Sequence, residues 1–237
     1  MESLAALADL PQLERRTLTD TAYAALSDLL ASGRLAPGDR LSLRRSAAAF
    51  GVSVMPVREA VSRLVAEGVL EVAPARVIRV PIMGASAFRA LAETRIAVEG
   101  IAAARAAERR TRAELGAIRQ AEEAFRAEAE SPQPDRIRAV QLNRDLHFAI
   151  YGACGLTPLT EIIGRLWLKA GPVINLDLRA CPERLQQGFA LRRHAEARAA
   201  IEARDGPAAA AAIAADIRAA ADFILSRGTL RDEHGEE

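Results

Sequence analysis

The segment over residues 41–82 constrains the fold of this chain more than any other part of the sequence. Within it, "SLRRSAAAF" and "PVREAVSRLVAEG" both carry apolar residues at helical spacing, with Ser42 and Pro56 at their starts. The three residues "GVS" lie between them, and Gly51 suits a tight turn. The next residues, "VLEVAPARVIRVPI", read as two short strands around a Pro-Ala-Arg turn. Two helices across a short turn, followed by a hairpin, predict a winged helix-turn-helix.

One earlier helix completes this domain. Its helical pattern starts at Leu18, with Thr19 as the candidate cap, and "SGRLAPGDRL" ends it with glycine and proline turn residues. We therefore predict a flexible N-terminal arm over residues 1–17 and the winged helix-turn-helix over residues 18–82.

After a short "MGAS" joint, strand patterns disappear and only helical patterns follow. Proline and glycine combine with capping residues at each break between them. The expected helices span residues 86–110, 111–130, 135–154, 158–177, 182–204 and 207–227. Short connections favour antiparallel neighbours. The expected fold class is mainly α: an N-terminal winged helix-turn-helix joined to an all-α antiparallel bundle of about six helices over residues 86–228, with a polar tail over 229–237.

Composition excludes several classes of protein. Half of the residues are hydrophobic, which is enough for a core, but no run of about 18 strongly apolar residues is present to span a membrane. The two cysteines form no CxxC pair, which argues against a disulfide scaffold or a zinc ribbon. The first residues lack a basic-then-apolar signal. We expect a cytoplasmic protein without a membrane partner. The net charge of +1 does not itself indicate a nucleic-acid partner.

Two parts of the sequence resemble a known family. The segments "SGRLAPGDRLS" and "FGVSVMPVREAVSRLVAEGVLE", with "RV" in the hairpin, resemble the N-terminal domain of GntR-family transcription regulators over residues 18–82. The segment "ETRIAVEGIAAARAA", followed by His147 and His194, resembles the FCD-type effector domain of the FadR-like subfamily over most of residues 86–227. Together they imply a homodimeric regulator, expected to be a repressor, that binds double-stranded operator DNA under the control of a small effector.

The second helix of the helix-turn-helix is the expected reading head. Residues at the start of such a helix contact base edges in the major groove, and its free N–H groups face phosphate. By the resemblance, Arg44, Ser53 and Arg58 match positions that touch DNA, and the wing around Arg76 reaches the minor groove. Taken alone, "PVREAVSRLVAEG" is only an amphipathic helix, and Arg58 then lies on plain surface.

Two departures from the family pattern predict an altered operator. Arginine commonly follows the serine in this family, whereas Val54 and Met55 stand there in this chain. An apolar contact, for example to a thymine methyl group, then replaces a polar one. The glycine often seen after the wing arginine is Val77 here, so we expect a different wing tip.

Four polar residues of the predicted bundle are spaced to converge. Asn143 and His147 are four residues apart and share a helix face. His194 precedes Asp205 by eleven residues and Asp216 follows it by eleven. An antiparallel pair of helices that turns at Asp205 holds both about 16 Å from the turn.

Two imidazoles and a carboxylate suit a divalent transition metal such as Zn, Ni or Mn. The resemblance implies a metal on an aspartate and three histidines. In this chain Asn143 occupies the aspartate position and Asp216 the last histidine position, a change expected to weaken the site. The alternative is a hydrogen-bonded polar cluster without a metal.

A small carboxylate effector is the ligand we expect beside this cluster. Arg95 is the candidate for binding its carboxylate in bidentate fashion. The alternative is a surface ion pair between Arg95 and Glu99, four residues apart. For Trp167 we expect core or dimer packing rather than a cofactor site.

Two rival functions use the same features. One is a metal-dependent enzyme with a His/His/Asp site in the bundle, but no further histidine or paired carboxylates supply a catalytic base, so we expect no enzyme activity. The other is a winged helix that contacts only proteins, against which Arg44 and Arg58 argue.

Overall fold

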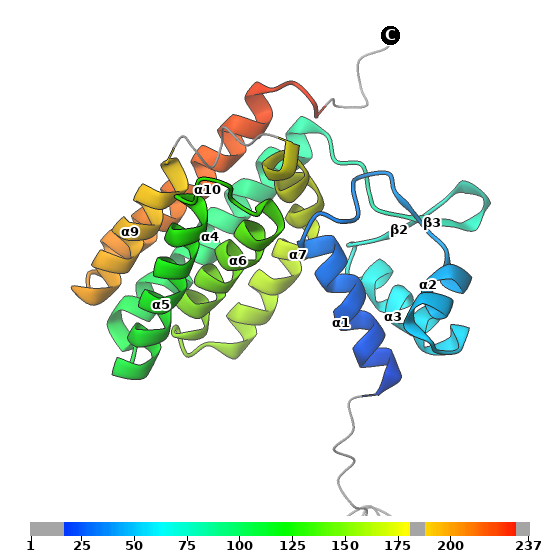
Figure 1. Ribbon diagram of the computed structural model, residues 1–237, viewed down its shortest axis with the longest axis horizontal. Helices are drawn as coiled ribbons and strands as arrows, with labels where there is room; N and C mark the ends of the chain where they lie inside the picture. The colour runs from blue at the N-terminus through cyan, green and yellow to red at the C-terminus, as the bar shows by residue number, and fades with distance from the viewer. Residues whose placement is uncertain (1–16, 181–187, 231–237) are drawn as a thin grey trace, which may run out of the picture.

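The computed structural model describes residues 17–180 and 188–230 of the chain. In Figure 1 the winged helix-turn-helix lies at the right and the helical bundle at the left, with one long helix between them. Residues 1–16 of the predicted arm over 1–17 and residues 231–237 of the tail lie outside the described residues. The expected start of the fifth bundle helix at residue 182 also lies outside them.

Local sequence explains the helices of the N-terminal part. The first helix is capped by Thr17 and not by Thr19, because the Thr17 hydroxyl accepts a bond from the Asp20 N–H and the Asp20 carboxylate accepts one in return. The hydroxyl of Thr19 instead donates to Glu59 at 2.7 Å. Gly51 ends the second helix at a φ of 66°, which a glycine adopts without strain. The elements are α1 (Leu18–Ala31), β1 (Arg40–Leu41), α2 (Leu43–Phe50), α3 (Val54–Ala66), β2 (Glu71–Ala73), a 3-10 turn (Pro74–Arg76) and β3 (Val77–Arg79).

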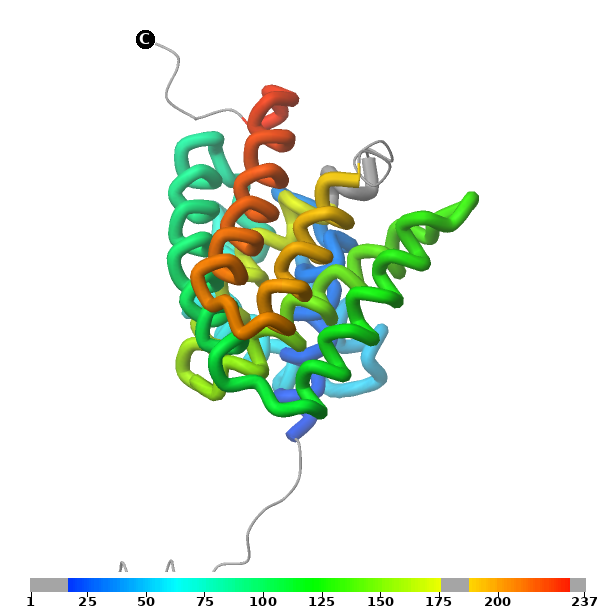
Figure 2. The backbone as a smooth tube through the Cα atoms, turned by 90° about the vertical axis from the view of Figure 1, so that its left-hand side faces the viewer, coloured from blue at the N-terminus to red at the C-terminus, as the bar shows by residue number. Residues whose placement is uncertain are grey.

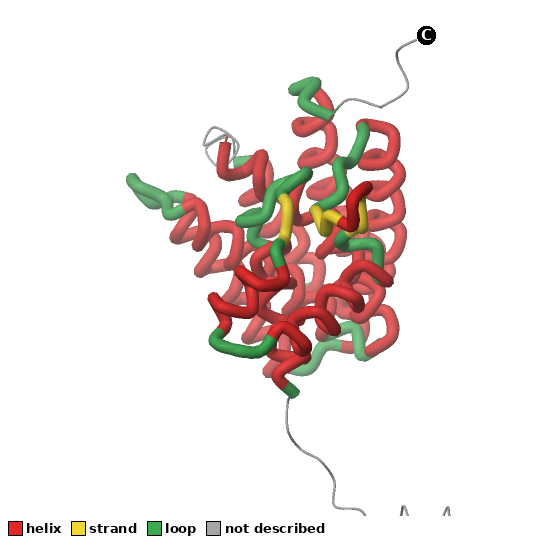
Figure 3. Tube along the Cα trace, turned by 90° about the vertical axis from the view of Figure 1, so that its right-hand side faces the viewer, coloured by secondary structure: helices red, strands yellow, loops and turns green. Residues whose placement is uncertain are grey.

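A three-stranded antiparallel sheet forms the wing, in the order β1-β3-β2. Strand β3 pairs Arg79 with Glu71 of β2 on one side and with Arg40 of β1 on the other. The sequence did not predict β1, because two residues are too few to show a strand period. Figure 3 shows this sheet and the helices below it from the right-hand side.

Six helices of the described residues build the second part. They are α4 (Ala85–Arg109), α5 (Arg112–Ala129), α6 (Arg136–Gly152), α7 (Thr157–Ala180), α9 (Phe189–Glu202) and α10 (Gly206–Ser226). Figure 2 shows α9 and α10 side by side, joined by a tight turn. The predicted fold class, a winged helix-turn-helix followed by an all-α antiparallel bundle, is confirmed. Among the described residues, no helix combines the length and apolarity needed to cross a membrane.

Small side chains let the bundle helices approach closely. A Cβ on Gly206 would lie 3.3 Å from the Ala104 carbonyl oxygen, and one on Gly100 would lie 3.8 Å from the Cβ of Ala210. The alanine-rich faces of α4 and α10 therefore pack as a core although they carry few large side chains. Many of these alanines are fully buried, among them Ala102, Ala103, Ala106 and Ala209.

Helix α7 packs against both the helical bundle and the winged helix. Its Leu168 is 8% exposed and belongs to the apolar core of the winged helix, next to residues such as Leu30. A Cβ on Gly171 would lie 2.9 Å from the Ala31 Cα, so only glycine fits this approach of α7 to α1. The Asn175 amide donates a hydrogen bond to the Ala31 carbonyl oxygen. The winged helix is thereby docked directly on the bundle.

Candidate DNA interface and metal-binding cavity

The start of α3 exposes groups suited to DNA. Ser53 is the N-cap residue, lies at the surface and makes no side-chain capping bond. Arg44 and Arg58 are exposed, and neither forms a hydrogen bond, ion pair or ring contact with a described residue. Met55 is 58% exposed, whereas Val54 is half-buried and packs against the core of the winged helix. Of the two residues that replace the usual arginine, Met55 is thus the one that faces outward.

Two arginines of this domain, Arg63 and Arg79, have protein partners. Arg63 contacts Asp20 at 3.7 Å and Glu67 at 3.3 Å, and its guanidinium lies 3.9 Å from the centre of the Tyr23 ring. Arg79 pairs with Glu71 at 2.5 Å across the wing. These cations are balanced within the protein. The charges of Arg44 and Arg58 are not balanced in this way, and they suit contacts to phosphate or to guanine.

The wing tip is built without glycine. Ala75 and Arg76 both have a φ of 59°, in the left-handed region that few non-glycine residues adopt. Val77 has a φ of −77°, so it needs no glycine and the expected difference in the wing tip lies one and two residues earlier. Arg76 is exposed at this tip and also has no ion-pair partner among the described residues.

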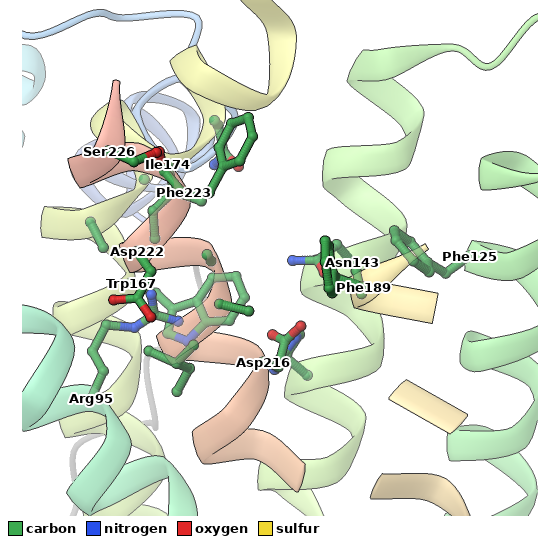
Figure 4. Close-up of a pocket in the computed structure, with 18 residues that line it drawn as sticks. Arg95, Phe125, Asn143, Trp167, Ile174, Phe189, Asp216, Asp222, Phe223 and Ser226 are labelled. Atoms are coloured by element: carbon green, nitrogen blue, oxygen red, sulfur yellow. The ribbon is translucent and has the colours of Figure 1, made fainter. Parts of the chain in front are cut away.

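The structure brings three of the four predicted metal ligands together, from α6, α9 and α10. His147 Nε2 lies 3.4 Å from one carboxylate oxygen of Asp216, and His194 Nε2 lies 3.6 Å from the other. One ligand atom from each residue lies within 4.8 Å of the others. Both histidines are 1% exposed. Asn143 lines the cavity beside them (Figure 4).

The ring of His194 is buried, and its two nitrogens lack hydrogen bonds to the part of the chain that the structure describes. Neither Nδ1 nor Nε2 has a hydrogen-bond partner among the described residues. Burial lowers the pKa of His194 to about 4, Asp216 opposes this shift, and His147 adds to it. The ring is therefore neutral at pH 7 and one of its nitrogens carries an unused lone pair. Together with the second imidazole and the carboxylate, a buried ring nitrogen without a hydrogen-bond partner among the described residues gives a donor set that could bind a divalent transition metal.

Next to the cluster lies a cavity of about 490 Å³, lined by residues of α4, α5, α6, α7, α9 and α10. Aromatic side chains form much of its wall: Phe125, Trp167, Phe189 and Phe223. Its polar lining groups include Arg95, Asn143, Asn175, Asp216, Asp222 and Ser226. Figure 4 shows Arg95 and Trp167 close together on one side of the cavity, away from Asn143. Such a space, largely apolar with a few polar groups, is typical of a small-molecule site.

Arg95 lines this cavity, but its guanidinium group is already hydrogen-bonded to the carboxylate of Glu99. Its Nε donates to Glu99 Oε1 at 2.6 Å and its Nη2 to Oε2 at 3.3 Å. This is the pair that the alternative interpretation expected at the surface, yet it is buried, with Arg95 at 5% and Glu99 at 0% exposed. The guanidinium also lies 4.8 Å from the ring centre of Trp167. Bidentate binding of an effector by Arg95 would require it to release Glu99.

Sequence reasoning missed Tyr151, a buried partner of both Glu99 and His147. The Tyr151 hydroxyl donates to Glu99 Oε2 at 2.5 Å and contacts His147 Nδ1 at 2.8 Å. Burial, followed by the nearby Glu99 charge, raises the pKa of Tyr151 well above its ordinary value. Tyr151 follows His147 by four residues, a spacing that could have signalled a shared face. Trp167, expected in core or dimer packing, is half-buried in the cavity wall.

Comparison with known proteins supports both parts of the chain. Residues 18–80 match the family of bacterial regulatory proteins named gntR, and residues 90–219 match the FCD domain. The HTH-type transcriptional regulator McbR of Escherichia coli strain K12 is 33% identical over 150 residues, covering 63% of this chain and 67% of McbR. The solved structure of E. coli McbR/YncC covers 91% of this chain and all of its own, with 28% identity and a TM-score of 0.83.

A second solved structure agrees in fold. The solved structure of a GntR transcriptional regulator from Rhodococcus sp. RHA1 matches 88% of this chain and 97% of its own, with 22% identity and a TM-score of 0.71. None of these comparisons supports the alternative of a metal-dependent enzyme. Because the two family matches coincide with the two expected domains, the chain belongs to the GntR family of transcription regulators and carries an FCD domain.

Proposed function

We propose that this regulator is a cytoplasmic homodimer that represses transcription and is controlled by a small organic acid bound in the bundle with the help of a divalent metal. The observation that carries this proposal is the convergence of His147, His194 and Asp216, two of which, His147 and Asp216, line a cavity of about 490 Å³. In this proposal residues 1–17 form an arm, 18–82 bind the operator, 86–228 bind the effector and dimerise, and 229–237 form a tail.

The donor set supports a metal. His147 Nε2, one nitrogen of His194 and the carboxylate of Asp216 would hold Zn, Ni or Mn, with the amide oxygen of Asn143 as a fourth donor. When bound, the metal supplies positive charge and an open coordination position to which an effector oxygen can bind. His147, Asp216 and Asn143, which line the cavity, would then hold the metal next to the space where an effector could bind.

The charges around the cavity explain why an acidic effector would need the metal. Glu99 balances the charge of Arg95 at contact distance. Asp216 and Asp222 both line the cavity, and the buried ring of His194 next to Asp216 is neutral. Without a cation this lining repels a carboxylate, whereas a divalent ion offsets the two aspartates. The aromatic wall then accepts the apolar part of the effector.

On the DNA side, Arg44, Ser53 and Arg58 would contact the major groove, with Met55 against the bases and Arg76 in the minor groove. An effector changes operator affinity only if it binds the two states of the regulator unequally. Helix α7 is suited to this coupling because it lines the cavity and also packs against α1.

The fluorescence of Trp167 can be used to test both metal binding and effector binding. Trp167 is the only tryptophan of the chain and lies 5.1 Å from His147 between ring centres, so its fluorescence should change when metal binds. Protein treated with a chelator is titrated with Zn, Ni and Mn and then with small organic acids, and metal content is measured by elemental analysis. The proposal expects acid binding only after metal is added. Metal-free protein that binds the acid with full affinity would contradict the metal's role.

DNA binding is tested on the sequence beside the protein's own gene. Arg58→Ala should weaken binding by about 1–3 kcal/mol if the arginine contacts a guanine. The control is Arg112→Ala, because Arg112 is exposed on the bundle and unpaired among the described residues. Equal affinity of Arg58→Ala and wild-type protein would show that the reading helix is assigned wrongly.

A further inference from the structure

Four buried side chains on α4 and α6 form a continuous chain of hydrogen bonds that ends at the proposed metal site. Arg95 donates twice to Glu99, Glu99 accepts from Tyr151, and Tyr151 contacts His147. Their exposure is 5% for Arg95, 1% for His147 and 0% for Glu99 and Tyr151. Groups this deeply buried must satisfy one another, so the direction of each hydrogen bond is constrained.

The chemistry of the four groups fixes where the hydrogens lie. Glu99 is paired with a guanidinium, so it is an ionised carboxylate and can only accept. A tyrosine hydroxyl has one hydrogen, and Tyr151 gives it to Glu99 Oε2 at 2.5 Å. At 2.8 Å from His147 Nδ1, the hydroxyl oxygen can then only accept. The hydrogen of that contact must come from the imidazole.

We infer that Glu99 and Tyr151 are positioning residues that hold His147 with a hydrogen on Nδ1 and so present the Nε2 lone pair to a metal. Nε2 is the nitrogen that lies 3.4 Å from Asp216 Oδ2. With its hydrogen on Nδ1, His147 turns a nitrogen lone pair toward a carboxylate, and this pairing of donor groups suits a bound cation. The inference rests on the proposed metal site and adds the residues that orient one of its ligands. Partners of this kind fix the tautomer of metal-binding histidines.

The second histidine has no such support. Neither nitrogen of His194 has a hydrogen-bond partner among the described residues, and its ring contacts Phe125 edge to face at 4.7 Å between centres. The tautomer of His147 is therefore fixed in the metal-free protein, whereas His194 can adopt either tautomer. The difference between the two rings provides an internal comparison for the experiment.

Nitrogen-15 NMR of the metal-free protein at neutral pH tests the inference directly. The chain has three histidines, and the variants His194→Gln and His234→Gln assign their signals. Wild-type His147 should carry hydrogen on Nδ1 and none on Nε2. Tyr151→Phe removes the acceptor, so His147 should shift toward the other tautomer or a mixture. The control is Tyr23→Phe, which removes a similar hydroxyl bond to Glu67 in the winged helix and should leave the spectrum unchanged.

Metal affinity provides the second readout. Competition with a chelator should show Tyr151→Phe binding the metal about 10- to 100-fold more weakly than wild type, and Tyr23→Phe binding it equally. A wild-type His147 with hydrogen on Nε2 or on both nitrogens overturns the inference, as does an unchanged tautomer in folded Tyr151→Phe. Protein that binds no metal while His147 keeps the expected tautomer would overturn the proposed metal site alone. Circular dichroism establishes that each variant is folded, and the wild-type spectrum decides the tautomer even if a variant unfolds.

Discussion

The buried neutral ring of His194 should make the metal-free protein sensitive to mild acid. Burial lowers its pKa to about 4 in the folded state, whereas an exposed histidine titrates near about 6.5. Between these values the unfolded chain binds more protons than the folded one, so the free energy of unfolding falls as the pH falls. The stabilisation is present above about pH 6.5 and is lost progressively toward about pH 4. Lowering the pH from about 7.5 to about 5 should remove about 2 kcal/mol through this residue alone.

Urea unfolding of chelator-treated protein at both pH values measures this loss. The reference is His194→Gln, which lacks the titrating ring and should lose about 2 kcal/mol less than wild type over the same interval. The carboxylates Glu114 and Glu202 have lowered pKa values, so their contribution falls only at lower pH and is common to both proteins. Identical pH dependence in wild type and His194→Gln would refute the argument that the ring is buried and neutral.

Three further substitutions probe the other parts of the molecule. Met55→Arg adds a cation at the start of α3, so the slope of log affinity against log salt should steepen by roughly 1 per subunit; an unchanged slope in filter binding would place Met55 away from DNA. Gly171→Ala forces a Cβ against Ala31 and should cost about 1–3 kcal/mol of stability, measured by thermal melting. The control is Gly164→Ala on the same helix, where an added Cβ meets no atom of the described residues within 4 Å, so it should not destabilise. Asp216→Asn removes the carboxylate from the cluster, and elemental analysis should then detect no retained metal; full metal retention would assign the ligands elsewhere.

Most of the fold can be predicted from local sequence patterns. Helical periodicity and the proline and glycine breaks are properties of neighbouring residues, so the helices and the wing hairpin could be predicted from sequence. Strand β1 was missed because its two residues are a strand only through pairing with β3. The cap was assigned to Thr19 because both threonines are good cap residues, and only the reciprocal bond with Asp20 distinguishes Thr17.

Tertiary packing decided what could not be predicted at the site. The spacing around Asp205 was enough to expect His194 and Asp216 at one height, since an antiparallel turn relates them. That Arg95 and Glu99 are buried, and that Tyr151 reaches Glu99 from another helix, depends on how α4 and α6 cross. No pattern within one helix contains that information.

Because α7 contributes to the cores of both domains, the DNA-binding domain of this regulator cannot simply be joined to another effector domain. Leu168 completes the core of the winged helix although it belongs to the effector part of the sequence. A cut at the joint near residue 84 therefore divides one core between two fragments, even though the chain looks modular there. A hybrid that joins this DNA reader to a foreign effector domain should expose Leu30 and neighbouring apolar side chains unless the receiving helix matches Leu168 and Gly171. Exchange of specificity among such regulators, in evolution or in biosensor design, would then proceed through the short start of α3 rather than through whole domains.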